Sequence, residues 1–264
     1  MDVWDATGHR MRGRLARPIA KPEIAPYLAR GYGVALVYYS QIEPDFDGGA
    51  ALGVRRMLGD VGKPRSDTDW GSVGVWSWGL SRVLDALQSD PKVDGKHVAL
   101  YGISRLGKTV LWAGAEDPRF AAVISVCSGE GGAALSRRDY GETIAAVAKN
   151  FPYWFAPRWN DFASNPAASP VDSNLVLSLI APRPLLLITS SEDAWSDPYG
   201  EYLAARSASP VWELLGKKGL GAGPYPAIDT PAGGDLAFMT HAGPHGPAKV
   251  DTNVILDFLD AHMK

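Results

Sequence analysis

The chain has 264 residues, of which 46% are hydrophobic and 21% charged, and this length and balance suit a globular protein with one large core. We therefore expect a single domain over residues 1–264. The net charge of −3, from 29 acidic and 26 basic residues, argues against nucleic acid as the main partner. No stretch approaches about 18 consecutive apolar residues, so no membrane span is expected.

Short apolar runs alternate with helix-like segments, which predicts an α/β fold with a mostly parallel sheet. The first 30 residues offer no good strand. The expected strands are residues 33–39, 97–102, 121–127, 184–190 and 236–241. The expected helices are residues 73–89, 108–116 and 250–263. Residues 45–70 form a long segment rich in Asp, Gly and Pro, whose length indicates either a functional role or disorder.

Residues 102–109 read GISRLGKT and fit two unrelated motifs. As G-x-x-x-x-G-K-T they match the P-loop, which binds nucleotide phosphates. As G-x-S-x-x-G they resemble a nucleophile elbow, in which Ser104 stands on a tight strand-to-helix turn. Bulky residues between the glycines disfavour phosphate binding, and strand 184–190 does not end in the acidic residue that magnesium needs. The elbow interpretation is favoured, and the P-loop stays open as the minor alternative.

The elbow interpretation requires an acid and then a histidine later in the chain. Asp193 and Asp197 follow strand 184–190, and His245 follows strand 236–241. An imidazole can activate a serine when a carboxylate orients it. Each residue also has a simpler interpretation, since Ser104 and either aspartate could cap helices and His245 could be a solvated loop residue. Their order, each after a strand, favours catalysis.

A longer set of motifs resembles a known family. G-x-S-R-x-G-K at the elbow, followed by GEGGAALSRR, SSEDAWSDPYGEY and HAGPHG, is similar to the glucuronoyl esterases of carbohydrate esterase family 15, especially the bacterial ones. The resemblance implies an α/β-hydrolase fold, with helices on both faces of the sheet. It implies cleavage of esters between (4-O-methyl-)glucuronic acid of glucuronoxylan and lignin alcohols, without cofactor or metal.

The resemblance also implies roles for individual residues. Ser104 matches the nucleophile, His245 the base, and Arg105 a residue that stabilises the oxyanion. Three further residues match positions that contact the sugar, and these are Lys108, Glu142 and Trp195.

The acid of the triad has two candidates. Many family members carry a glutamate at the position of Cys127, whereas others carry an aspartate that matches Asp193. Asp193 is therefore the preferred acid, and Glu130 is the second candidate. His241 is the less favoured base, because it falls within the expected strand rather than in the loop after it. Cys127 is most simply a small buried residue.

Family members have additional residues before the point where this chain begins. By resemblance the chain is then shortened at its N-terminus, and its sheet would lack strands beside the nucleophile strand. The resemblance implies a secreted or periplasmic protein, although residues 1–18 lack a signal peptide's apolar stretch. Two alternatives remain, namely another carbohydrate esterase, such as one acting on acetyl xylan, and an inactive carbohydrate-binding relative.

Overall fold

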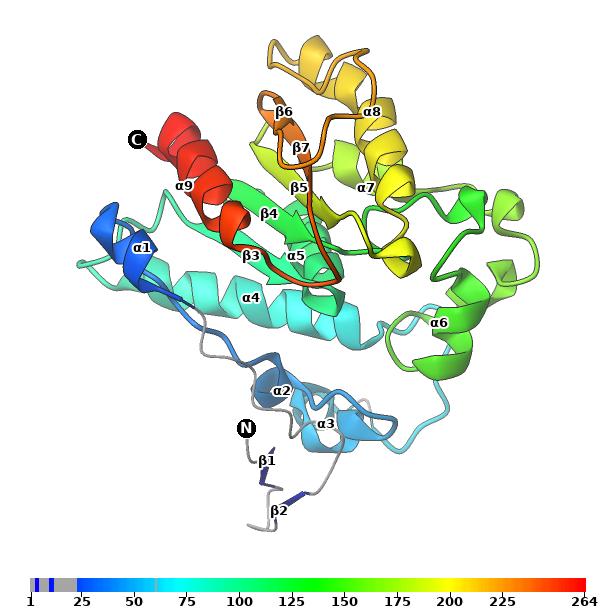
Figure 1. Ribbon diagram of the computed structural model, residues 1–264. Helices are drawn as coiled ribbons and strands as arrows, with labels where there is room; N and C mark the ends of the chain where they lie inside the picture. Colours follow the sequence, from blue (N-terminus) through cyan, green and yellow to red (C-terminus); the bar gives the residue numbers. More distant parts are fainter. Residues whose placement is uncertain (1–2, 5–9, 12–22, 60) are drawn as a thin grey trace.

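The computed structural model describes residues 3–4, 10–11, 23–59 and 61–264, and its elements are drawn in Figure 1. The strands are β1 (Val3–Trp4), β2 (Arg10–Met11), β3 (Ala99–Ile103), β4 (Ala122–Val126), β5 (Leu185–Ser190), β6 (Ala232–Gly233) and β7 (Leu236–His241). The α-helices are α1 (Ala25–Ala29), α2 (Tyr39–Ile42), α3 (Val54–Met57), α4 (Ser72–Ser89), α5 (Arg105–Glu116), α6 (Ile144–Asn150), α7 (Ser173–Ser178), α8 (Pro198–Leu214) and α9 (Lys249–Met263).

The main sheet has five strands in the order β3-β4-β5-β7-β6. Strands β3, β4, β5 and β7 are parallel, whereas β6 pairs antiparallel with β7. Helices connect the parallel strands, as such crossovers require. The carboxyl ends of four strands therefore meet along one edge of the sheet, where loops can bring distant side chains together.

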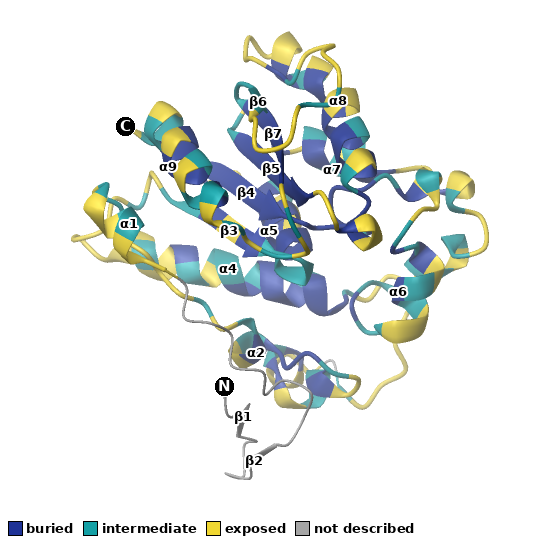
Figure 2. Cartoon of the chain, viewed as in Figure 1, coloured by how far each residue is buried: buried dark blue, intermediate teal, exposed yellow. Residues whose placement is uncertain are grey.

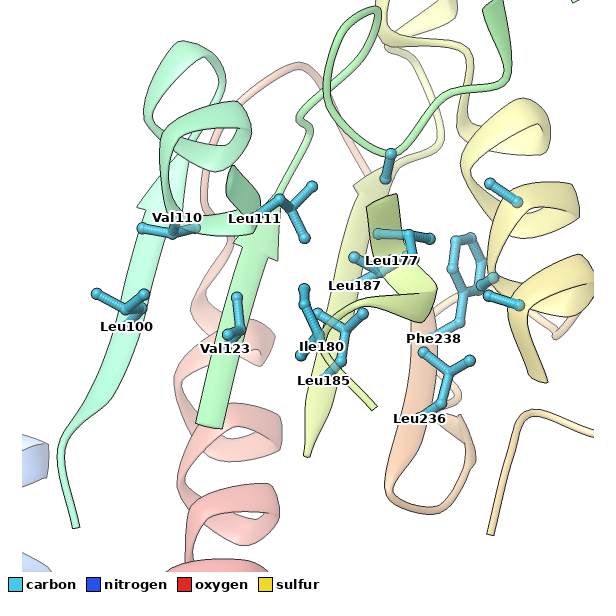
Figure 3. Close-up of a cluster of buried hydrophobic side chains, with 14 of the residues drawn as sticks. Leu100, Val110, Leu111, Val123, Leu177, Ile180, Leu185, Leu187, Leu236 and Phe238 are labelled. Atoms are coloured by element: carbon cyan, nitrogen blue, oxygen red, sulfur yellow. The ribbon is translucent and has the colours of Figure 1, made fainter. Parts of the chain in front are cut away.

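Helices cover both faces of the sheet, and successive side chains of β5 point to opposite faces. Leu185 and Leu187 belong to a core cluster formed with α4, α5, α7 and α8 (Figure 3). Leu186 and Ile188 point the other way, into a cluster with α9. Strands β4, β5 and β7 are buried, whereas the outer helix surfaces are exposed (Figure 2). Among the described residues, no helix has the length and apolar character to cross a membrane.

Most expected elements are confirmed, including the four parallel strands and the helices over 73–89, 108–116 and 250–263. The strand expected at residues 33–39 is wrong, because residues 33–38 have no regular structure and Tyr39 begins α2. A strand requires a hydrogen-bonded neighbour, and β3 is the last strand of the sheet on its side.

The N-terminal part differs slightly from the expectation. It contains the short antiparallel pair β1 and β2, where no good strand was expected, while residues 1–2, 5–9 and 12–22 lie outside the described part. The long segment at residues 45–70 contains a 3-10 turn (Gly49–Leu52) and the short helix α3. It is therefore structured in its first half.

Candidate active site

Ser104 lies in the sharp turn between β3 and α5, with φ 60° and ψ −126°. This conformation is strained for a residue with a side chain, and such strain is concentrated at functional sites. Ser104 occupies the N-cap position of α5, yet its side chain makes no capping hydrogen bond. The simpler interpretation of Ser104 as a helix cap is therefore wrong, and its hydroxyl is left available for chemistry.

Two glycines make this turn possible. A Cβ at Gly102 would stand 2.2 Å from the carbonyl oxygen of Leu106, and one at Gly107 would stand 2.9 Å from Ser125 Oγ. Gly102 lets the first turn of α5 fold back on β3, and Gly107 lets the helix lie against β4. The contact with β4 falls three residues after Ser104, which explains why this motif has its second glycine one position later than the common elbow.

Lys108 makes hydrogen bonds that a phosphate-binding lysine would not make. Its Nζ donates to Glu142 Oε2 at 2.7 Å and to the Ser128 carbonyl at 2.6 Å. Both side chains of the ion pair are buried. A P-loop lysine has to reach the nucleotide phosphates, and this geometry therefore contradicts the P-loop alternative.

His245 and Asp193 form a close pair at the carboxyl edge of the sheet. His245 Nδ1 lies 2.6 Å from Asp193 Oδ2, with the carboxylate buried and the imidazole partly exposed. Burial alone would raise the pKa of Asp193, but hydrogen bonds from His245 and Ser196 hold it below its usual value. An ionised carboxylate on Nδ1 fixes the tautomer and leaves Nε2 free to accept a proton.

The other acid and base candidates have different partners. Glu130 accepts hydrogen bonds from Ser136 Oγ at 2.5 Å and from the backbone nitrogen of Gly131 at 3.1 Å. His241 is buried against Asp251, with 2.9 Å between Nδ1 and Oδ1. Asp197 caps α8 by accepting from Gly200 N at 3.0 Å. The structure thus joins His245 to Asp193 and gives these three residues other contacts.

Ser104 reaches the same edge through the neighbouring strand. Its backbone nitrogen donates to the Val126 carbonyl at 2.8 Å, directly before Cys127. Cys127, Asp193 and His245 have side-chain ligand atoms within 4.8 Å of one another. No hydrogen bond joins Ser104 Oγ to His245, which is common before substrate aligns a catalytic pair.

The cluster of Cys127, Asp193 and His245 is also the group in the described residues that could hold a metal ion. The carboxylate and the imidazole already bond to each other, and Cys127 Sγ lies 2.9 Å from Ser190 Oγ. Burial raises the pKa of the Cys127 thiol to about 12. Metals bind the thiolate, so a metal ion at this cluster would have to displace the thiol proton and the hydrogen bond between Asp193 and His245.

Arg105 follows Ser104 and has a partner that the sequence did not reveal. Its guanidinium forms an ion pair with the buried carboxylate of Asp45. It also lies 5.1 Å above the centre of the Trp154 ring, within the range of a cation–π contact. The only signal in the sequence was that Asp45 begins the long segment with a suspected functional role. Ser196 also supports the acid, because its backbone nitrogen donates to Asp193, and no motif in the sequence marks it.

Trp195 stands beside the Lys108–Glu142 pair. The backbone nitrogen of Glu142 donates to the Trp195 carbonyl at 2.6 Å, and the Trp195 side chain is 50% exposed. Several other tryptophans are core residues, including Trp76, Trp154 and Trp212. The three residues expected to contact a sugar therefore lie together, on loops that follow β4 and β5 and on the first turn of α5.

Known proteins resemble this chain over most of its length. The family model described as "Glucuronyl esterase, fungi" matches residues 65–216, which is more than half of the chain. The chain belongs to this glucuronyl esterase family. The relative "Carbohydrate esterase MZ0003", from an unknown prokaryotic organism, is 40% identical over 243 residues, which cover 91% of this chain and 56% of the relative.

Solved structures of glucuronoyl esterases extend the comparison. The enzyme from Solibacter usitatus is 41% identical with a TM-score of 0.89, covering 100% of this chain and 68% of that one. The enzyme from Teredinibacter turnerae is 36% identical with a TM-score of 0.85, covering 90% and 57%. The expected α/β-hydrolase fold is therefore confirmed.

Relatives that are named for an activity are longer than this chain. The 4-O-methyl-glucuronoyl methylesterase 1 of Wolfiporia cocos is 33% identical over 162 residues, which cover 57% of this chain and 39% of the relative. With 56% of the prokaryotic esterase covered, the chain spans about half the length, or less, of these curated relatives.

Proposed function

We propose that this chain is a serine esterase that cleaves esters of glucuronic acid, including its 4-O-methyl form, through an acyl-enzyme. The proposal rests on Ser104, which has a strained backbone and a hydroxyl that makes no capping hydrogen bond. It lies at the same edge of the sheet as the His245–Asp193 pair. Family membership supports the choice of an ester substrate, since relatives bear the name 4-O-methyl-glucuronoyl methylesterase.

The chemistry follows from the placement of these groups. Ser104 Oγ attacks the ester carbonyl while His245 Nε2 takes its proton, and the Asp193 carboxylate stabilises the resulting imidazolium. The alcohol leaves with that proton, and the uronoyl group stays on Ser104. A water molecule, deprotonated by His245, then releases the glucuronate.

The negative charge on the carbonyl oxygen needs a donor close to Ser104. The backbone nitrogen of Arg105 is at the first turn of α5, where helix amides have no internal acceptor. The same residue carries a guanidinium, which is held by its ion pair with Asp45. Donors that are already oriented before charge develops are among the largest contributions to catalysis.

The sugar lies on the acyl side of a uronate ester, so the pocket beside Ser104 has to be polar. Lys108 uses two of its three N–H groups on Ser128 and Glu142, which leaves one for a sugar hydroxyl. Glu142 offers its second carboxylate oxygen, and the half-exposed Trp195 offers a flat face. A pocket for an acetyl group would instead be small and apolar.

The proposal is tested by hydrolysis of benzyl glucuronate by the 264-residue chain, with its Ser104→Ala variant and 4-nitrophenyl acetate as comparisons. We expect glucuronate cleavage that is lost in Ser104→Ala. A folded protein that cleaves only the acetyl ester contradicts the uronate specificity. A folded protein that binds glucuronoxylan fragments but neither cleaves esters nor reacts with a fluorophosphonate is an inactive relative.

A further inference from the structure

Two half-exposed tyrosines gather around one arginine beside the candidate active site. Tyr140 is 51% exposed and Tyr199 is 48% exposed. The Arg138 guanidinium lies 5.5 Å from the centre of the Tyr140 ring and 5.2 Å from that of Tyr199. Arg138, Tyr140 and Tyr199 are called the Arg138 platform below. Large aromatic side chains left exposed as a group often mark a binding surface.

The platform is held rigidly from beneath. Arg138 Nε donates to Asp197 Oδ2 at 2.7 Å, and this carboxylate is buried and caps α8. The Tyr199 ring stacks on the buried Tyr202 at 5.9 Å between centres. A rigid surface loses little conformational freedom when a ligand binds.

The platform still has free hydrogen-bonding groups. Arg138 Nη1 and the hydroxyls of Tyr140 and Tyr199 have no hydrogen-bond partner within the described part of the chain. Donors beside flat aromatic faces match a pyranose ring, which presents C–H groups on its faces and hydroxyls around its edge. A purely apolar ligand would leave these groups unpaired.

Short chain connections link the platform to the proposed uronate pocket. Tyr140 is two residues before Glu142, whose nitrogen donates to the Trp195 carbonyl at 2.6 Å. Gly141 between them lies against the same loop, since a Cβ there would be 2.4 Å from the Ala194 carbonyl oxygen. The Arg138 platform therefore adjoins the pocket made by Lys108, Glu142 and Trp195.

We propose that the Arg138 platform is a second carbohydrate subsite, which binds a neutral xylosyl ring attached to the uronate. This rests on the proposed function, since the resemblance to the glucuronoyl esterases implies a uronate joined through its anomeric carbon to a xylan chain. The subsite would make the enzyme prefer a uronate ester carried on an oligosaccharide over the same ester of a single sugar.

Two benzyl esters test the subsite, one of free glucuronic acid and one of glucuronic acid linked to xylotriose. Tyr199→Ala and Tyr140→Ala should each lower the ratio of kcat/KM for the oligosaccharide ester to that for the simple ester, roughly three- to tenfold. Tyr199→Phe is the matched control, because it keeps the ring, and it should change the ratio less than Tyr199→Ala. An unchanged ratio in both alanine variants overturns the subsite.

Binding separates this proposal from the proposed esterase activity. Calorimetry with Ser104→Ala and the unesterified uronoxylotriose should show binding that is weakened by adding Tyr199→Ala. If the wild-type chain cleaves neither ester but this difference in binding holds, the subsite stands and the esterase proposal fails. If uronoxylotriose binds equally with and without Tyr199→Ala, or does not bind, the subsite is overturned.

Discussion

Asp45 holds the side chain of Arg105, the residue that follows the elbow serine, although the two are 60 positions apart in the chain. The Asp45 carboxylate is buried and also accepts hydrogen bonds from Trp154 Nε1 at 2.8 Å and Tyr153 OH at 3.0 Å. Such a network fixes in one orientation the guanidinium of the residue that follows Ser104. The segment that begins at Asp45 thus reaches the active-site turn directly.

Asp45→Asn should therefore impair catalysis through Arg105. The amide keeps hydrogen-bonding capacity but loses the charge, so we expect kcat for benzyl glucuronate to fall by about 10- to 100-fold, with a smaller change in KM. Tyr39→Phe is the control, since it removes only a 3.3 Å hydrogen bond to Asp45. If Arg105→Ala is impaired while Asp45→Asn has the wild-type kcat, Asp45 does not position Arg105.

Two conservative substitutions distinguish between the two candidates for the triad acid. Asp193→Asn should lower kcat by ~10³- to 10⁴-fold, because an amide no longer holds the useful tautomer of His245. Glu130→Gln should keep kcat within about tenfold of wild type, since Glu130 contacts Ser136 rather than His245. The reverse ranking in steady-state kinetics of the two folded variants assigns the acid to Glu130.

Much of this site follows from sequence order. Ser104, Asp193 and His245 each come just after an apolar strand, and parallel strands bring those positions to one edge. Asp45 could not be found in this way, because only tertiary packing brings it to Arg105. The strand expected at residues 33–39 failed for a related reason, since an apolar run becomes a strand only beside a partner. Val34 and Leu36 in that run are exposed.

Removing one partner of the buried pair of Lys108 and Glu142 should destabilise the protein. The two side chains are 3% and 8% exposed, so Lys108→Met leaves a buried carboxylate without its cation. We expect the free energy of unfolding in urea to fall by ~3–5 kcal/mol, and the double change Lys108→Met with Glu142→Gln to recover part of it. Equal stability of wild type and Lys108→Met would show that water solvates the Glu142 carboxylate once the cation is removed.

Glu201 predicts a dependence of stability on pH. It is fully buried beneath the loop at Ser128 and Gly129, and burial raises its pKa to about 8 against the hydrogen bonds that they donate. In the unfolded chain the pKa of this glutamate is about 4.3. The native state therefore binds more protons between these values, and the stability from Glu201 is complete below the lower value and lost as the pH rises through 8.

Glu201→Gln removes this titration while keeping the acceptor for Gly129. Relative to wild type, the variant should gain stability as the pH rises from 5 to 8, by at most about 1.4 kcal/mol per pH unit. Urea unfolding at several pH values measures the difference, and Glu213→Gln, at an exposed position on the same helix, should show no such trend. A constant difference between Glu201→Gln and wild type means that Glu201 is ionised throughout.

The elbow itself can be tested through its first glycine. A Cβ at Gly102 would stand 2.2 Å from the Leu106 carbonyl oxygen, which is backbone and cannot rotate away, whereas Gly33 has nothing within 4 Å of that position. Gly102→Ala should therefore lower the free energy of unfolding by ~3 kcal/mol or more, and Gly33→Ala should leave it nearly unchanged. Because the turn has to open to admit the methyl group, labelling of Ser104 by a fluorophosphonate should slow in Gly102→Ala even where the protein remains folded. Wild-type stability and labelling in Gly102→Ala would mean that α5 does not fold back on β3 as tightly as this turn requires.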